Sequence, residues 1–135
     1  DVSSQSAAAI ARWLARHPLV ERVYYPGLPE HQGHALQARQ ASGFGAVLSF
    51  DLGCRERVKA LLEAVRLPLV AVSLGAVETI LSYPAQMSHA SMPPAERCRR
   101  GITDGLLRLS VGLEDVDDLL ADLEQALAAA SGVKV

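Results

Sequence analysis

The clearest pattern in the chain runs from Gly105 to Leu127, where the spacing of the apolar residues changes once. Leu107, Leu109 and Val111 alternate with polar or small residues, which is typical of a β-strand with one apolar face. From Val116 onward the apolar residues recur every three or four positions, as they do on one side of a helix. This stretch therefore predicts a strand that leads directly into an amphipathic helix.

The start of this helix carries capping signals. Asp115 has a side chain suited to the N-cap, and Asp117 and Asp118 place carboxylates in the first turn, where the helix dipole favours them. The tail from Ala128 to Val135 thins into small residues, and we expect it to fray.

The same reading of apolar spacing predicts elements along the rest of the chain. Helices are expected over Ala7–Arg16, around Leu36, and over Arg55–Val65 and Glu96–Arg100; strands are expected over Val20–Tyr25, Gly43–Leu52, Leu67–Val72 and Glu78–Tyr83. Ser3 or Ser4 is available to start the first helix. Because Leu67–Val72 carries no charge, we expect it to be central in the sheet. The predicted fold class is α+β, a single domain over residues 1–135 with helices packed on one face of a mostly antiparallel sheet.

Composition narrows the classes of function. The chain has 135 residues, of which 50% are hydrophobic, and this suits one domain with its own core. The net charge is -2 and there is no basic block, so we expect no nucleic-acid partner. No apolar run is long enough for a membrane span or a signal peptide, which predicts a soluble, cytoplasmic protein without a membrane partner. The first residue is Asp1 rather than Met, so we expect a processed, fragmentary or engineered product.

The cysteines and histidines of the sequence give little support for a metal site or a disulfide framework. Cys54 and Cys98 lie far apart and belong to no paired-cysteine motif, which argues against a disulfide framework or a thiolate zinc site. His31 and His34 are three residues apart and could share a helix face, but no third or fourth ligand is nearby. We therefore expect no metal site, and we place these histidines at a surface or an interdomain contact.

No catalytic set emerges from the residues alone. Ser73, Ser88 and His89 offer hydroxyls and an imidazole, but no nucleophile-elbow pattern surrounds either serine. The only lysines are Lys59, on the outer side of a predicted helix, and Lys134, at the end of the chain. Neither lies in an apolar pocket that would activate it for covalent chemistry.

Arg108, on the less apolar face of the strand, has two interpretations. In the first, it is a solvated residue whose stem covers apolar surface on an open sheet face, and this suits the rarity of fully buried arginine. In the second, its guanidinium is a fork of N–H donors, held on a rigid element, that binds a carboxylate in bidentate fashion. The residues alone leave both open.

Four segments, in this order, carry a resemblance. They are YYPGL at 24–28, GFGAVLSF at 43–50, AVSLGAVETILSYPAQMSHA at 71–90 and GITDGLLRLSVGLEDVDDLLADLEQAL at 101–127. Together they resemble the C-terminal domain of the Cys/Met-metabolism family of pyridoxal-phosphate enzymes. This family includes the cystathionine lyases, cystathionine γ-synthase, methionine γ-lyase and the homoserine sulfhydrylases. The resemblance covers almost the whole chain.

The resemblance implies roles for particular residues. Arg108 would bind the α-carboxylate of an amino-acid substrate, and Ser73 would lie beside both this carboxylate and the cofactor. Val72 stands where several γ-lyases and γ-synthases carry Glu, and Ser88 would contact the distal end of the substrate. The family's catalytic lysine and the rest of its cofactor site belong to a large N-terminal domain, so the resemblance implies no catalytic residue in this chain.

The implied function is that of a substrate-carboxylate-binding domain in a transsulfuration enzyme of the cystathionine γ-lyase or methionine γ-lyase type. The parent enzyme would use pyridoxal phosphate, whereas this chain alone would be inactive and bind none. Its expected partners are the missing N-terminal domain, a sulfur amino acid and a second copy of the chain. The alternative is a free-standing amino-acid-binding or interaction module that has lost the chemistry.

Overall fold

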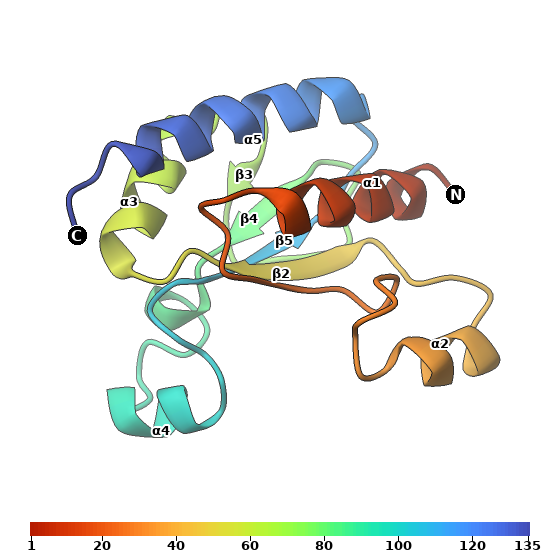
Figure 1. The fold of residues 1–135 in the computed structure, drawn as a ribbon, viewed down its shortest axis with the longest axis horizontal. Coiled ribbons are helices and arrows are strands. Elements are labelled where there is room, and N and C mark those ends of the chain that lie inside the picture. Colours follow the sequence, from red (N-terminus) through yellow and green to blue (C-terminus); the bar gives the residue numbers. More distant parts are fainter.

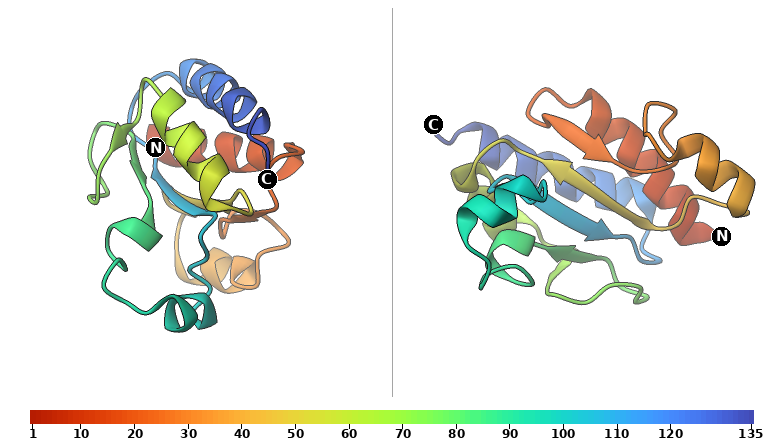
Figure 2. Two further views of the ribbon diagram at one scale, coloured as in Figure 1. Left: turned by 90° about the vertical axis from the view of Figure 1, so that its left-hand side faces the viewer. Right: turned by 90° about the horizontal axis from the view of Figure 1, so that it is seen from below.

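Three helices cover one face of a five-stranded sheet in this computed structural model, which describes residues 1–135 (Figure 1). The helices are α1 (Val2–Arg16), α2 (His34–Gln40), α3 (Arg55–Ala64), α4 (Pro94–Arg99) and α5 (Val116–Ser131), with a short 3-10 helix η1 (Pro84–Gln86). The strands are β1 (Arg22–Tyr24), β2 (Val47–Asp51), β3 (Leu69–Val70), β4 (Ile80–Ser82) and β5 (Leu106–Ser110). Helices α1, α3 and α5 form the covering layer, and the right-hand view of Figure 2, from below, shows the face of the sheet that these helices leave uncovered.

The strands follow the order β1-β2-β5-β4-β3. β1 pairs with β2, β2 with β5 and β5 with β4 in antiparallel fashion, but β3 and β4 are parallel. The sheet is therefore mixed, and the prediction of a mostly antiparallel sheet is corrected. The reason is the connection from Ala71 to Thr79, which returns to the starting end of β3 before β4 begins.

The core lies between the sheet and its three covering helices. The side chains that fill it are all almost fully buried and come from both layers: Leu48, Phe50, Leu81, Leu107 and Leu109 from strands, and Ile10, Leu14, Leu61, Leu119 and Leu123 from helices. Leu107, Leu109 and Val111 share the buried face, as the alternation predicted. Arg108 consequently projects from the opposite face of β5, which no long helix covers.

β3 is an edge strand, so the prediction of a central position is wrong. Leu69 is 50% exposed and Val70 46% exposed. The absence of charge in this run reflects an apolar surface that this chain leaves uncovered, and not burial on both sides of the strand.

The ends of two helices test the capping predictions. The carboxylate of Asp115 accepts a hydrogen bond of 2.8 Å from the backbone N–H of Asp117, which confirms Asp115 as the N-cap of α5. The helix continues to Ser131, because Ala130 is fully buried in the core, so fraying does not begin at Ala128. Ser4 lies inside α1, which already begins at Val2, and its hydroxyl donates to the carbonyl of Gly45.

We expect the Asp115→Ala variant to lose about 1 kcal/mol of unfolding free energy, because the N–H of Asp117 loses its acceptor. Urea denaturation of the chain measures this loss. The matched control is Glu124→Ala, at an exposed position in the middle of the same helix, where we expect a change within about 0.5 kcal/mol. Equal losses in the two variants would show that the cap does not stabilise the helix.

Candidate functional site

Arg108 lies at the centre of the uncovered sheet face. In the strand register it stands between Ser49 of β2 and Ser82 of β4. Its neighbours Leu107 and Leu109 are fully buried against the helices, so the backbone that carries Arg108 is fixed by the core. The side chain is half-buried and extends from a rigid element.

The guanidinium of Arg108 is held on one side only. Its Nη2 donates to the carbonyls of Val72 at 2.7 Å and Ser73 at 3.1 Å, and to the hydroxyl of Ser82 at 3.2 Å. Its Nε is buried and has no hydrogen-bond partner. A buried N–H without an acceptor is costly, and a carboxylate oxygen is a strong acceptor for a guanidinium. The Arg108 guanidinium is thus held by neutral oxygen atoms and can still bind an anion.

The predicted residues Val72 and Ser73 do lie beside Arg108, but they contact it through their backbone carbonyls. Ser82, which the sequence analysis did not single out, contacts Arg108 and also donates its hydroxyl to the carbonyl of Ala71. Only the pairing of β4 with β5 brings Ser82 to this place, and no local pattern indicates that register.

Ser88 lies elsewhere, in the loop that follows β4. Its hydroxyl forms a hydrogen bond of 2.8 Å with Nδ1 of His89, and both side chains are at least partly exposed. The structure shows no hydrogen bond from this pair to Arg108 or Ser73. Ser88 and His89 could therefore act together with Arg108 and Ser73 only if one ligand were long enough to contact both places.

Glu114 and Thr79 form a second polar group beside the segment that contacts Arg108. The carboxylate of Glu114 accepts from the backbone N–H and from the hydroxyl of Thr79, both at 2.7 Å. Burial alone would raise the pKa of the Glu114 carboxyl, but the two hydrogen bonds from Thr79, together with the backbone N–H of Glu114 itself, outweigh it. The pKa therefore lies below its ordinary value of 4.5.

Because of this pKa shift, the free energy of unfolding of the chain should decrease at acidic pH. The pKa of Glu114 is lower in the folded than in the unfolded state, so its contribution is present above about pH 4.5 and disappears as the pH falls through the folded value. We expect the urea midpoint to fall more steeply below about pH 4.5 in the wild type than in Glu114→Gln. Glu124→Gln, at an exposed site, should keep the wild-type slope. Equal slopes for all three proteins would contradict the linkage.

The remaining titratable candidates do not assemble into a site. The structure has no group of three or more His, Cys, Asp or Glu side chains that could hold a metal ion. His34 donates from Nδ1 to the carbonyl of Pro26 at 2.7 Å and stacks on Phe44, while Nδ1 of His31 accepts from Gly33. Cys54 and Cys98 are not bonded to each other.

Neither lysine is placed to hold a cofactor covalently. Lys59 on α3 and Lys134 in the tail are both exposed. A lysine that forms a covalent bond with an aldehyde cofactor needs an environment that removes its proton, which an exposed surface does not supply. Within this chain, no lysine therefore has the surroundings that a covalent bond to pyridoxal phosphate needs. No helix of the structure has the length and apolar character needed to span a membrane.

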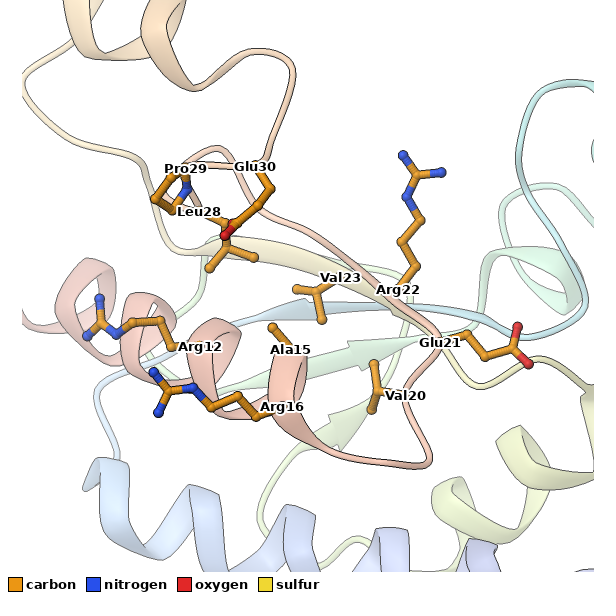
Figure 3. A pocket seen from close by; sticks show the side chains of 10 residues that line it. All are labelled: Arg12, Ala15, Arg16, Val20, Glu21, Arg22, Val23, Leu28, Pro29 and Glu30. Carbon is orange, nitrogen blue, oxygen red and sulfur yellow. The ribbon is translucent and has the colours of Figure 1, made fainter.

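A cavity of about 510 Å³ lies between α1 and the turn after β1, and none of the candidate residues lines it (Figure 3). Arg12 and Arg16 extend from α1 on one side of it, whereas Arg22 and Glu21 point away. Because three arginines and two glutamates border an open hollow, its charges nearly balance. This cavity is separate from the site around Arg108.

Comparison with known proteins gives concordant results. The family model described as "Cys/Met metabolism PLP-dependent enzyme" matches residues 1–128. The chain is 59% identical over 133 residues to cystathionine β-lyase MetC of Bacillus subtilis, covering 98% of this chain and 34% of that protein. It is 53% identical over 123 residues to cystathionine γ-lyase of the same organism, covering 91% of this chain and 32% of that protein.

Among solved structures, cystathionine γ-synthase from Xanthomonas oryzae pv. oryzae in complex with cystathionine matches with a TM-score of 0.91 and 48% identity. The match covers 96% of this chain and 34% of that one. The chain thus spans about a third of the length of these relatives. The family that the four motifs predicted is confirmed, and with it pyridoxal phosphate as the cofactor of the full-length protein. This chain belongs to the Cys/Met metabolism family of pyridoxal-phosphate-dependent enzymes.

Proposed function

We propose that this chain is the C-terminal domain of a transsulfuration enzyme, of the cystathionine γ-lyase or methionine γ-lyase type, in which Arg108 binds the α-carboxylate of a sulfur amino acid. The observation that carries the proposal is the buried Nε of Arg108, an N–H donor without an acceptor. Because Nε is buried in this conformation, the guanidinium would turn toward a substrate on the uncovered sheet face, where a carboxylate oxygen supplies that acceptor.

The charge of Arg108 supports the same role. None of the three ion pairs in the structure includes it, and its present partners are two carbonyls and a hydroxyl. Its positive charge is therefore not neutralised by this chain. Because β5 is fixed by the core, a carboxylate held there is also oriented, which aligns the bonds of the substrate for reaction.

The other predicted residues surround this anchor in the proposal. Val72 is 57% exposed and would offer apolar contact to the substrate side chain. Ser73 has a hydroxyl free of hydrogen bonds to the chain, and we assign it to the carboxylate and the edge of the cofactor site. Ser88, on the loop after β4, would reach the distal end of the substrate.

Pyridoxal phosphate, when bound, supplies the electron sink for proton removal beside the carboxylate and for cleavage or replacement at the carbon–sulfur bond. Since both lysines of this chain are exposed, we assign the covalent attachment of the cofactor to residues outside it. The contribution of this chain is to bind the carboxylate and to hold its orientation.

An apolar strip beside the site indicates where the rest of the enzyme would dock. Its members are all more than 40% exposed and lie on β3 and next to it: Leu67, Leu69, Val70, Val72, Leu74 and Val77. Exposed apolar patches and open sheet edges are typical of interfaces. We propose that the cofactor-binding domain covers this strip in the parent enzyme, and that a second copy of the chain competes for it when that domain is absent.

The test compares this chain with a polypeptide that also includes the upstream cofactor domain. After incubation with pyridoxal phosphate and desalting, we expect the longer protein to keep the absorption band of bound cofactor and to cleave cystathionine. The 135-residue chain should do neither. A band retained by the short chain would instead mean that Lys59 or Lys134 captures the cofactor. Micromolar binding of an amino acid by the short chain alone would favour the free-standing binding module.

A further inference from the structure

The segment from Val72 to Glu78, which carries the carbonyls that contact Arg108, is not held by burial. All seven of its residues are exposed, and Leu74 and Val77 have 54% and 65% of their surface accessible. An exposed segment without packing keeps a single conformation only if hydrogen bonds fix its backbone. The position of the two carbonyls therefore depends on polar contacts.

Two neutral contacts hold the middle of the segment. The N–H of Gly75 donates to the hydroxyl of Ser110 at 2.9 Å, and the N–H of Leu113 donates to the carbonyl of Val77 at 2.8 Å. Each is a single hydrogen bond between neutral groups, so each contributes little by itself.

The far end of the segment is held by a charged group. Thr79 is fully buried, and it donates both its N–H and its hydroxyl to the carboxylate of Glu114, while the same hydroxyl accepts from the N–H of Gly112 at 2.9 Å. Hydrogen bonds to an ionised acceptor are about twice as strong as neutral ones. Glu114 is thus the strongest tie between this segment and the turn that follows β5.

At Gly112, the turn after β5 comes very close to the end of the Val72–Glu78 segment. A Cβ built at this glycine would lie 2.3 Å from the carbonyl oxygen of Val77, so only glycine fits without moving the segment. Glu114 and Gly112 together hold the end of the segment directly against the turn after β5.

We propose that Glu114 is a positioning residue of the carboxylate site: through Thr79 it fixes the segment that bears the Val72 and Ser73 carbonyls, and these carbonyls orient the Arg108 guanidinium. The inference rests on the proposed function of Arg108. Arg108 and Glu114 contact opposite ends of one segment and do not touch each other. When substrate draws the guanidinium toward its carboxylate, Glu114 keeps the segment in place.

Steady-state kinetics of the full enzyme test this role. We expect Glu114→Ala to raise KM for the amino-acid substrate about 10-fold, with kcat within about 2-fold, since it weakens a contact made equally before and during reaction. Glu114→Gln keeps one acceptor oxygen and should give a smaller rise in KM. The matched control is Glu124→Gln, on the exposed side of α5, which should leave both constants unchanged.

A purely structural role would give a different signature. Loss of folded enzyme lowers kcat in proportion and leaves KM unchanged, and this result would overturn the inference. Amide hydrogen exchange provides a second measurement that does not need activity. In Glu114→Gln we expect faster exchange at Thr79 and Gly75 and no change at Val111, whose N–H donates to the carbonyl of Ala46 just beyond the paired ends of β5 and β2. Unchanged exchange at Gly75 would also overturn it.

The failure of this inference can be separated from that of the proposed function. If Arg108→Ala raises KM and both Glu114 variants leave it unchanged, Arg108 binds the carboxylate but Glu114 does not position it. If Arg108→Ala leaves KM unchanged, the proposed function of Arg108 is wrong, and the role of Glu114 at a carboxylate site falls with it.

Discussion

Replacing Arg108 with alanine should lower kcat/KM of the full enzyme about a thousandfold. The variant removes the only cation that we place at the substrate carboxylate, and truncating one partner of a desolvated charge pair costs about 4 kcal/mol. Because the carboxylate is bound before and during the reaction, most of the loss should appear in KM. Steady-state kinetics with cystathionine as substrate measure it.

Arg108→Lys separates charge from geometry. Lysine keeps the positive charge but lacks the planar fork, and it cannot donate from two fixed nitrogens at once. We expect its kcat/KM to fall between those of the wild type and the alanine variant. Arg39→Ala, at an exposed position on α2, is the matched control and should behave as wild type. If Arg108→Ala retained half of the wild-type kcat/KM, the carboxylate would have to be bound elsewhere.

Phe50→Ala should have the largest effect on folding, a loss of about 3–5 kcal/mol in the free energy of unfolding. Phe50 is fully buried on β2, in register with Val23 of β1 and Leu107 of β5, so the truncation leaves a cavity under the helices. Urea denaturation of the chain measures the loss, which is a large part of the stability of a small domain.

The neighbouring Ser49 supplies the control for this variant. It lies on the same strand but faces the uncovered side of the sheet, beside Arg108. Ser49→Ala removes a hydroxyl outside the core and should change stability by less than about 0.5 kcal/mol. Similar losses at both positions would mean that the core does not lie on the helix side of the sheet.

The elements that the sequence predicts best are those whose signal is local. Leu107, Leu109 and Val111 share one buried face because alternation along a strand requires it, and Asp115 caps α5 because its carboxylate reaches an N–H two residues away. The Cys/Met metabolism family was also predictable, since four ordered motifs span nearly the whole chain. Neighbouring residues carry the information in each of these cases.

The features that the sequence did not predict depend on residues far apart. Glu114 and Thr79 are 35 positions apart, and Arg108 and Ser82 are 26 apart, so no periodicity brings them together. The predicted central position of β3 is wrong for a related reason. An uncharged apolar run has the same sequence pattern whether its surface is buried within this chain or covered by another part of the protein. Its parallel pairing with β4, which makes the sheet mixed, likewise depends on the path of the connection.

The connection between β3 and β4 has a consequence for how such a site can change. Parallel neighbours usually need a crossover of a dozen or more residues, often a helix, whereas here nine residues from Ala71 to Thr79 suffice because the two strands are very short. The residues of this connection also line the site around Arg108. The number of residues in that part of the site is therefore set by the distance that the connection has to span between β3 and β4. For the proposed carboxylate site, we therefore expect substrate preference to diversify, over evolutionary time and in engineering, by exchange of side chains such as Val72, and not by insertions or deletions in this connection.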